Sequence, residues 1–471
     1  MGIPLRSSLL ASLLRPWVGG RSPWRKETKA AVCGCRGYST EKQHRTTPEA
    51  SGERKKSDYW TNNPLVIHDI EYPVDNWTSV TPSILQKIDR NLHLQKDHPL
   101  FLMKELIIDH FHRFYTNSRG NALFTVTDRL SPVVSVEQNF DSLLIPPDHV
   151  SRKKSDCYYV NRNVVLRGHT SAHQADLIRS GLDAFLVVGD VYRRDEIDRS
   201  HFPVFHQMEG LRTYTLEQLS SRSSVPPPLS SFASEEEDPE SPIDNSIQLC
   251  HPPEVAEALE IDLKQTLEKL AQDVYGRVDL RWVPTTFPFT QPSWEMEIKI
   301  NDKWSEVLGC GITRQEILQK CGAGHRVGWA FGLGLERWAM KRYSIPDIRV
   351  FWSNDTGFLC QFRGKEPTDH VEYVPISVHP QCVNNISFWL PETADFSSND
   401  FNELVREVGG DLVEQVNLKD EFFHPKHQKW SHCYEIVYRA LDRTLRQSEA
   451  NEVHGKIEKA AEDILGVKIR G

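Results

Sequence analysis

The stretch GDVYRRDEIDRSHFPVFHQMEG (residues 189–210) predicts two β-strands joined by a charged loop. An apolar run leads into two consecutive arginines, and beyond the loop Phe205, Gln207 and Glu209 alternate. Alternate residues of a strand share one face, so these three side chains are predicted to lie together. A guanidinium stays charged and donates in a planar fork, which suits a phosphate group. Taken alone, the stretch also fits an exposed hairpin with solvated charges.

A second stretch, GWAFGLGLERWAM (residues 328–340), predicts a strand followed by a helix. Gly332 and Gly334 allow close backbone packing, and the helix would carry Arg337 in its first turns. Glycines before a helix that bears a basic residue suit an anionic group. The same pattern also fits glycines that serve packing alone.

The segment TTFPFTQPSW (residues 285–294) contains two rings that are either core or the lining of a pocket. If the segment is extended, Phe287 and Phe289 stand on the same side. Pro288 lacks a backbone donor, which is unfavourable within a ladder of strands. The residues of this segment leave both interpretations open.

Composition limits the kind of protein. A chain of 471 residues predicts about two to four domains. Its 56 basic and 65 acidic residues give a formal charge of −9, so any basic surface must be local. No run approaches the roughly 18 consecutive apolar residues of a membrane span. The nine cysteines are scattered without a zinc-binding spacing, which predicts buried thiols in a reducing compartment and no zinc site.

Residues 1–38 differ from the rest of the chain in their amino-acid composition. Basic residues recur there with no acid until Glu27, and leucine and serine fill the spaces between them. This composition predicts a mitochondrial transit peptide. The alternative is a basic N-terminal segment without a fixed structure. Residues 39–58 are polar and predict a disordered linker.

Residues 59–362 are predicted to form the larger domain. Two helices are expected near its start, one capped by Thr81 and the other by Asp97. The tract 220–253 is rich in serine, proline and acid, and cannot bury enough apolar area to order itself. We interpret this tract as a solvated loop inside the domain; a domain boundary is the alternative.

Residues 374–471, after a linker at 363–373, predict a second domain. Their pattern of strand, helix, strand, strand, helix and strand is the order of a ferredoxin-like fold. Many unrelated modules share this order, so the fold alone does not decide the function. The domain has 11 Lys/Arg and 16 Asp/Glu, and therefore lacks a uniformly basic face for RNA.

Together these stretches resemble the catalytic core of the phenylalanine–tRNA ligase family of class II aminoacyl-tRNA synthetases. HTSAHQ (169–174), the stretch 189–210, FPFTQPS (287–293) and VLGCG followed by GWAFGLGLER occur in the family's order. The resemblance implies an α+β fold, with helices flanking an antiparallel sheet and a C-terminal ferredoxin-like, anticodon-binding domain. The implied reaction is ATP-dependent attachment of L-phenylalanine to mitochondrial tRNA(Phe) through a phenylalanyl-adenylate.

The resemblance implies roles for single residues around ATP. Arg193, rather than Arg194, would contact the α-phosphate, and the other catalytic residues would be His201 and Arg337. Phe205 would stack on adenine, and Glu306 is a candidate ligand of Mg²⁺. The implied ATP site comprises Arg193, Asp195, Ser200, His201, Phe202, Phe205, Glu306 and Arg337.

The implied amino-acid site has a polar and an aromatic part. Gln207 and Glu209 would receive the α-ammonium, because a carboxylate suits it electrostatically. Phe287 and Phe289 would wall the substrate ring, and the small Ala330 would leave room for it. The remaining members of the implied site are His169, Ser171, Ala172, His173, Gln174, Met208 and Phe331.

The implied partners are L-phenylalanine, ATP with Mg²⁺, and mitochondrial tRNA(Phe). The protein is expected to act as a monomer in the mitochondrial matrix, without membrane contact or zinc. Two alternatives stay open: a class II-like amide-forming ligase that does not use tRNA, and an inactive relative that serves as an RNA-binding protein. A protein-contact or stabilising role is the alternative for residues 374–471.

Overall fold

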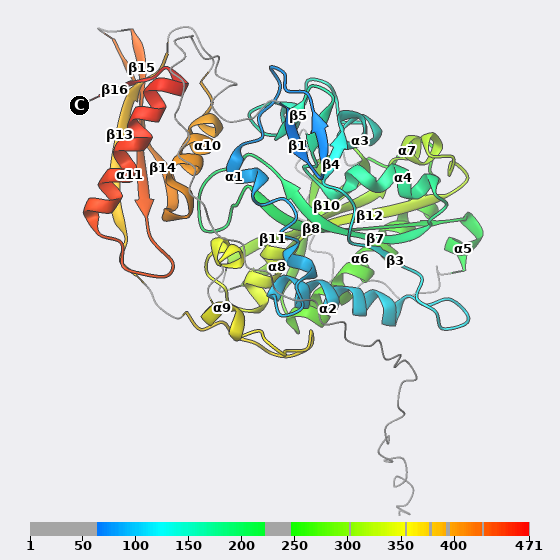
Figure 1. Ribbon diagram of the computed structural model, residues 1–471. Coiled ribbons are helices and arrows are strands. Elements are labelled where there is room, and N and C mark those ends of the chain that lie inside the picture. Colours follow the sequence, from blue (N-terminus) through cyan, green and yellow to red (C-terminus); the bar gives the residue numbers. More distant parts are fainter. Residues whose placement is uncertain are drawn as a thin grey trace, which may run out of the picture. The chain divides into compact units, whose positions relative to one another are not determined.

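The computed structural model describes residues 64–221, 246–300, 303–353, 356–375, 379–391, 396–425 and 428–470. The chain divides into two compact units, residues 1–53 and 54–471, and all described residues belong to the second (Figure 1). The predicted transit peptide, the predicted linker at 39–58 and most of the tract 220–253 lie outside the described residues.

A seven-stranded sheet forms the centre of the larger domain, in the order β3-β7-β8-β12-β11-β10-β9. Strands β3 and β7 run parallel, and every other neighbouring pair is antiparallel. All residues of β7, which lies between β3 and β8, are buried, as its continuous apolar run predicts. The predicted antiparallel sheet is thereby confirmed. The strands are β3 (Thr125–Thr127), β7 (Ala184–Tyr192), β8 (Val204–Tyr214), β12 (Val327–Gly334), β11 (Lys303–Thr313), β10 (Thr290–Ile300) and β9 (Leu280–Phe287).

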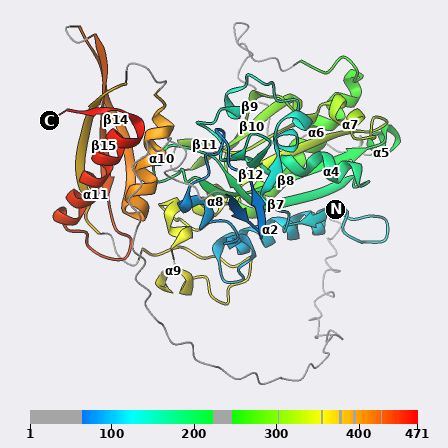
Figure 2. The same cartoon turned by 45° about the horizontal axis from the view of Figure 1, so that its top comes forward.

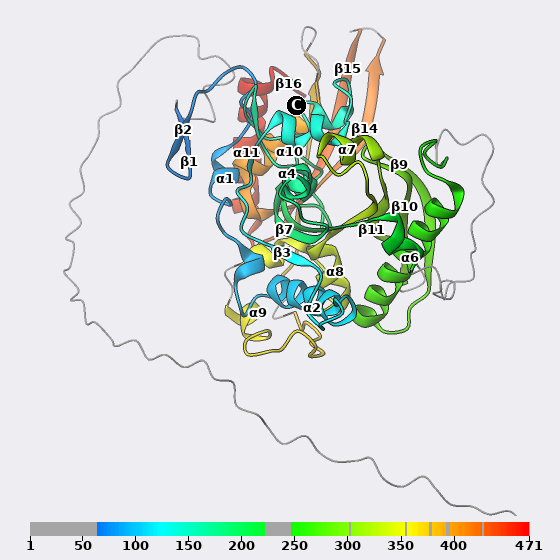
Figure 3. The ribbon, with the colours of Figure 1, turned by 90° about the vertical axis from the view of Figure 1, so that its right-hand side faces the viewer.

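Three helices cover one face of this sheet, as Figure 3 shows. They are α2 (Pro99–Phe114), α6 (Pro253–Tyr275) and α8 (Leu335–Arg342). Their apolar stripes meet the strands in a large core, in which Phe111 of α2 stacks on Phe331 of β12 with ring centres 5.5 Å apart. This helix-covered face carries the structural core of the domain.

Two of the predicted helix starts differ in outcome. Helix α1 (Pro82–Leu85) begins directly after Thr81, as predicted. Helix α2 is capped by His98, whose Nδ1 accepts a hydrogen bond from the Leu100 backbone N–H at 3.2 Å. The predicted cap at Asp97 is therefore wrong by one residue, because the proline that follows His98 takes the first helical position.

Smaller elements lie on the opposite face. Helices α4 (Gln174–Arg179) and α7 (Gln315–Lys320) pack there against β7 and β8. A three-stranded sheet, in the order β4-β6-β5, borders them. The remaining elements of the domain are β4 (Val133–Ser135), β5 (Tyr159–Asn161), β6 (Val164–Leu166), β1 (Leu65–Ile67), β2 (Ile70–Tyr72), α3 (Val136–Asn139), α5 (Leu216–Ser220) and α9 (Thr356–Cys360).

The C-terminal domain has the predicted ferredoxin-like order, with an antiparallel sheet β14-β15-β13-β16 (Figure 1). Figure 2 shows two of these strands, β14 and β15, beside the helices α10 and α11. Two helices pack on one face of this sheet, around a core that includes Phe388, Phe401, Ile436 and Ile457. The other face bears neither of these helices. The elements are β13 (Cys382–Trp389), α10 (Ser398–Gly409), β14 (Val413–His424), β15 (Lys429–Tyr438), α11 (Gln447–Ala460) and β16 (Lys468–Ile469).

Candidate active site

Arg193 follows the end of β7 and lies beside the start of β8. Its Nε donates to the Gly168 carbonyl at 2.7 Å, and its guanidinium lies 5.3 Å from the centre of the Phe205 ring. The next residue, Arg194, points elsewhere and forms an ion pair with Asp400 at 3.0 Å. Arg193 is therefore the arginine that accompanies Phe205.

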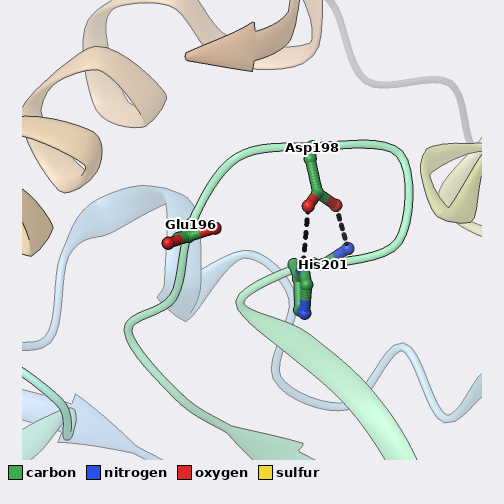
Figure 4. A group of neighbouring side chains, drawn as sticks. All are labelled: Glu196, Asp198 and His201. Carbon is green, nitrogen blue, oxygen red and sulfur yellow. Dashed lines mark hydrogen bonds and ion pairs between the residues drawn. The ribbon is translucent and has the colours of Figure 1, made fainter. Parts of the chain in front are cut away.

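The Asp198 carboxylate organises the loop between β7 and β8 (Figure 4). Its Oδ1 accepts from the backbone N–H groups of Ser200 at 2.6 Å and of His201 at 2.7 Å, and its Oδ2 accepts from His201 Nδ1 at 2.7 Å. The hydrogen bond to Asp198 raises the pKa of His201, which favours the charged imidazolium. Glu196 completes a group whose ligand atoms lie within 4.8 Å of one another. Because both Asp198 oxygens already accept hydrogen bonds, the group fits a support for the loop better than a metal site.

Arg337 enters the same region from the first turn of α8. Its Nη1 forms an ion pair with Glu306 Oε1 of β11 at 3.1 Å, and both side chains are half exposed. Burial lowers the pKa of Arg193, although part of that side chain reaches solvent, and the charge of Arg337 adds to the lowering. The two arginines thus lie within electrostatic reach of each other. Two cations and the ring of Phe205 suit a ligand that joins phosphates to an aromatic base.

Four small residues leave part of the sheet face without large side chains. They are Gly309 and Gly311 of β11, and Ala330 and Gly332 of β12. These residues are paired across the two strands, and we call them the small-residue surface. A Cβ on Gly309 would lie 2.8 Å from the Phe287 ring, and one on Gly332 would lie 2.8 Å from Gln207 Nε2. Glycine at position 309 leaves space for the Phe287 ring, and at position 332 it leaves space for the amide end of Gln207.

One edge of the small-residue surface is polar. Glu209 of β8 lies opposite Gly332 of β12. Gln207 lies two residues before Glu209, on the same face of β8. The Glu209 carboxyl accepts from the Ser171 hydroxyl and, at 3.5 Å, from Thr170 Oγ1. Burial raises the pKa of Glu209 to about 7. A cation beside this carboxyl would favour its charged form, so the group is suited to an ammonium ligand.

The other edge is aromatic. Phe287 ends β9 and Phe289 lies in the tight turn before β10, so the segment 285–294 forms a hairpin and not one extended strand. The two rings lie 5.7 Å apart, with an angle of 7° between their planes. Phe289 also lies 6.4 Å from the His169 ring. The small-residue surface therefore connects a carboxyl group to a pair of stacked rings, which fits an amino acid with a planar apolar side chain.

Comparison with known proteins decides the family. The family described as "tRNA synthetases class II core domain (F)" matches residues 90–221 and 255–362. A probable mitochondrial phenylalanine–tRNA ligase of Drosophila melanogaster is 52% identical over 421 residues, which cover 86% of this chain and 92% of the relative. The chain belongs to the mitochondrial phenylalanine–tRNA ligase family.

Other comparisons agree with this membership. The mitochondrial phenylalanine–tRNA ligase of Mus musculus is 50% identical over a matched region that covers 85% of this chain and 87% of the relative. The mitochondrial phenylalanine–tRNA ligase of Saccharomyces cerevisiae is 36% identical over a matched region that covers 83% of this chain and 92% of the relative. Residues 377–470 match the "Ferredoxin-fold anticodon binding domain". As a phenylalanine–tRNA ligase of class II, the chain is an ATP-dependent enzyme that aminoacylates tRNA(Phe).

The HTSAHQ segment of this phenylalanine–tRNA ligase divides between the site and the core. Ser171 reaches Glu209, as described above, whereas the ring of His173 accepts a hydrogen bond from Arg167 Nη1 at 2.9 Å, away from the small-residue surface. Ala172 belongs to a buried apolar cluster. Gln174 is buried, and its Oε1 accepts no hydrogen bond from any residue that the structure describes. Gln174 therefore retains an acceptor for a ligand.

Two residues of the implied phenylalanine site lie on the other side of the sheet. Met208 alternates with Gln207 and Glu209, and Phe331 alternates with Ala330, so both point into the helix-covered core. Phe331 stacks there on Phe111. The structure thus does not bring Met208 and Phe331 to the small-residue surface, and their alternation in the strands is the reason.

Three residues of the implied ATP site contact other protein groups in or beside the loop between β7 and β8. The Ser200 hydroxyl donates to Asp198 Oδ1 at 2.9 Å. Asp195 Oδ1 accepts from the Glu196 backbone N–H at 2.8 Å. Phe202 stacks on Trp352, with ring centres 5.4 Å apart. These contacts shape the loop that carries His201.

Sequence reasoning overlooked Glu295 of β10. Burial raises the pKa of this carboxyl, and the charge of Glu306 raises it further, so the two acids are electrostatic neighbours. The alternating segment WEMEIKI (residues 294–300) could have placed Glu295 on one face of its strand. Its proximity to Glu306 depends on the pairing of β10 with β11, which no local pattern predicts.

Among the residues that the structure describes, no helix is long and apolar enough to span a bilayer.

Proposed function

We propose that the small-residue surface and its two edges hold L-phenylalanine and ATP for the formation of phenylalanyl-adenylate. The observation that carries this proposal is the continuity of one sheet face. Glu209 stands at one edge of the small-residue surface and the Phe287–Phe289 ring pair at the other. Phe205 lies two residues before Gln207 on the same face of β8, and its ring contacts the Arg193 guanidinium.

ATP is proposed to lie over β8 and the start of α8. Phe205 stacks on adenine, and Arg193 contacts the α-phosphate from the position its bond to Gly168 gives it. Arg337 reaches the γ-phosphate, exchanging its contact with Glu306 for one with the nucleotide. His201, positively charged through its bond to Asp198, approaches the phosphates from the loop. Guanidinium and imidazolium groups stabilise the charge that develops on the leaving pyrophosphate.

Mg²⁺ is proposed to bind beside the phosphates. Glu295 and Glu306 supply carboxylate oxygens, the ligand type that Mg²⁺ takes, and their mutual repulsion favours a cation between them. When bound, the ion neutralises charge on the phosphate oxygens. Arg337 would then have to share Glu306 with the metal, which links metal binding to the position of the arginine.

Phenylalanine is proposed to place its ring by Phe287 and Phe289 and its ammonium at Glu209. Gln174 and Gln207 supply further polar contacts around the amino-acid backbone. A carboxylate oxygen of phenylalanine attacks the α-phosphorus, the bond to pyrophosphate breaks, and the mixed anhydride forms. A ribose hydroxyl of the terminal adenosine of tRNA then attacks the carbonyl carbon, and AMP leaves. No protein nucleophile takes part, so the residues act by position and charge.

The C-terminal domain is proposed to bind mitochondrial tRNA(Phe) on the open face of its sheet. Ser431 pairs with Phe422 on one side and with Trp389 on the other, and Trp389 pairs with Lys468. These four residues form a row across the sheet. Arg470 lies 4.6 Å from the Trp389 ring.

The row suits unpaired nucleotides. Aromatic rings stack on bases of any sequence, and adjacent cations meet the phosphates. Phe422 is 43% exposed, which leaves its face available for stacking. An acid on the same face, Glu435, is already paired with Lys419 at 3.0 Å. The charge of the domain is thus compatible with a local RNA-binding surface despite its acidic total.

Two further properties are proposed from the sequence and its relatives. The mitochondrial names of the relatives and the cationic residues 1–38 support import into the mitochondrial matrix through a cleaved transit peptide. A single chain that carries both a class II core and an anticodon-binding domain supports a monomer.

The test of the proposed function is ATP–pyrophosphate exchange with each of the twenty amino acids and with meta-tyrosine, followed by charging of tRNA(Phe). We expect exchange with phenylalanine to exceed that with every other amino acid, and tyrosine and its meta isomer to follow. An apolar pocket rejects an added hydroxyl by only about 10²-fold. Exchange without any tRNA charging would favour an amide-forming ligase, and absence of exchange would favour an inactive RNA-binding relative.

A further inference from the structure

A buried carboxylate and a buried imidazole connect the two strand–helix segments of the site. Glu336 and His206 have side chains that are 2% and 0% exposed. The His206 backbone N–H donates to Glu336 Oε2 at 2.8 Å, and His206 Nδ1 donates to Glu336 Oε1 at 2.7 Å. One carboxylate therefore binds both the main chain and the side chain of a single residue.

The location of this pair follows from the end of a strand ladder. The pairing of β8 with β12 stops where Gln207 faces Gly334, because the chain turns into α8 at Leu335. The next residue of β8 towards the loop is His206, whose backbone N–H has no β12 carbonyl opposite it. The Glu336 carboxylate supplies the acceptor in place of the strand.

The neighbours of the pair are the residues proposed to contact ATP. Phe205 precedes His206, and Arg337 follows Glu336. Alternation along β8 turns Phe205 to the site face while His206 faces the core. A buried bidentate contact between His206 and Glu336 therefore holds the backbone of Phe205 at a set distance from that of Arg337.

We propose that Glu336 and His206 are positioning residues, which fix the adenine-stacking ring and the phosphate-binding arginine in one geometry. This inference rests on the proposed roles of Phe205 and Arg337. Packing around the imidazole limits its movement: the Trp352 ring stacks on it at 5.9 Å, and the His93 ring lies at 5.0 Å. A loss of the contact would change the separation of Phe205 and Arg337, and a displacement of about 1 Å in a site is worth up to about 10²-fold in rate.

The chain offers a matched pair of the same chemistry away from the site. His110 Nδ1 bonds to Asp273 Oδ2 at 2.8 Å and connects α2 to α6 on the helix-covered face. The His110 side chain is 1% exposed. Neither of these residues adjoins a side chain of the proposed site. This pair therefore stabilises the packing of two helices but positions no residue of the site.

The experiment measures the KM values for ATP and for phenylalanine in pyrophosphate exchange, with the affinity for ATP also measured by equilibrium titration. The variants are Glu336→Ala, Glu336→Gln, His206→Ala, His206→Asn and the control His110→Ala. We expect Glu336→Ala and His206→Ala to weaken ATP binding by about tenfold or more and to leave the KM for phenylalanine unchanged. His206→Asn retains an N–H near the Nδ1 position and should recover most of the ATP affinity. His110→Ala should lower the melting temperature without changing either KM.

Several outcomes would overturn the inference. One is an equal rise of both KM values in the Glu336 and His206 variants, and another is unchanged ATP affinity in a folded variant. If Glu336→Ala does not fold, Glu336→Gln and His206→Ala decide, and normal ATP affinity in both rejects the positioning role. A wild-type chain that binds ATP but shows no phenylalanine-dependent exchange would instead reject the proposed function, while the ATP titrations would still test the positioning role.

Discussion

The two sheets of this chain share an architecture and differ in their uncovered faces. Each is largely antiparallel, and each forms its largest core between helices and one face. In the larger domain, Gly309 and Gly332 leave room on the opposite face for the side chains of Phe287 and Gln207, and buried polar groups border this area. In the C-terminal domain, the opposite face carries Phe422, Trp389 and neighbouring cations. Side-chain size on the face opposite the main core, rather than the order of strands, therefore distinguishes a small-molecule site from a polymer surface.

The largest effect is expected from the cations of the larger sheet. Arg193→Ala and Arg337→Ala should each lower the rate of phenylalanine-dependent pyrophosphate exchange by roughly 10²–10³-fold, because each removes a preorganised charge from the phosphates. Arg194→Ala is the matched control, since this neighbouring arginine pairs with Asp400 instead. Near-normal exchange in Arg193→Ala, or an equal loss in Arg194→Ala, would contradict the assignment.

The next effect concerns the small-residue surface itself. Gly309→Ala would bring a Cβ within 2.8 Å of Phe287 and displace the ring. Overpacking of this kind costs about 1–3 kcal/mol, so the KM for phenylalanine should rise roughly 10- to 100-fold. Gly455→Ala in α11 is the control, because its Cβ would meet open space, and it should leave kinetics unchanged. Phenylalanine kinetics that are normal in Gly309→Ala would show that the surface does not hold the substrate.

Substitutions on the face of the C-terminal sheet that carries Trp389 and Phe422 should affect the charging of tRNA rather than amino-acid activation. Trp389→Ala and Phe422→Ala should raise the KM for tRNA about tenfold each, since a base stacked on an aromatic ring is worth about 1–3 kcal/mol. Pyrophosphate exchange should be unchanged, because that reaction does not need tRNA. Phe423→Ala and Trp430→Ala provide the control: these rings lie 5.3 Å apart and pair with each other on the other face of the same hairpin. Equal losses in all four variants would mean that hairpin stability, and not stacking, is being measured.

The smallest effect is a pH dependence. Burial raises the pKa of Glu209 to about 7, so the carboxyl is mostly neutral below that pH and mostly charged above it. Only the charged form attracts the substrate ammonium, and the affinity for phenylalanine should therefore increase as the pH rises. Between pH 6.5 and 7.5 the charged fraction rises about threefold, and the KM for phenylalanine should fall by a similar factor. Glu209→Gln should raise this KM and remove its dependence on pH; a retained dependence would assign it to another group.

Much of the fold could be predicted from the sequence because its signals are local. The apolar run of β7 and the alternation of β8 predict a hairpin, and the last hundred residues carry one pattern per element. The cap of α2 was displaced by one residue because Asp97 and His98 are both plausible before Pro99. Local signals therefore fix elements well and their ends less well.

The site was less predictable because it depends on pairing between distant strands. Arg337 reaches Glu306 only through the pairing of β11 with β12, and no local pattern gives that register. Phe287 and Phe289 would share one side of an extended segment, but residues 288 and 289 form a tight turn in which the two rings stack. Met208 and Phe331 were assigned by resemblance, although strand alternation turns both to the core.

The most direct test of the account is a crystal structure with a non-hydrolysable phenylalanyl-adenylate analogue. We expect the adenine to stack on Phe205 and the ammonium to contact Glu209. We also expect the phenyl ring to lie over the small-residue surface against Phe287 and Phe289. An analogue bound with its phenyl ring away from this surface, or with its adenine away from Phe205, would contradict the central claim that one sheet face holds both substrates.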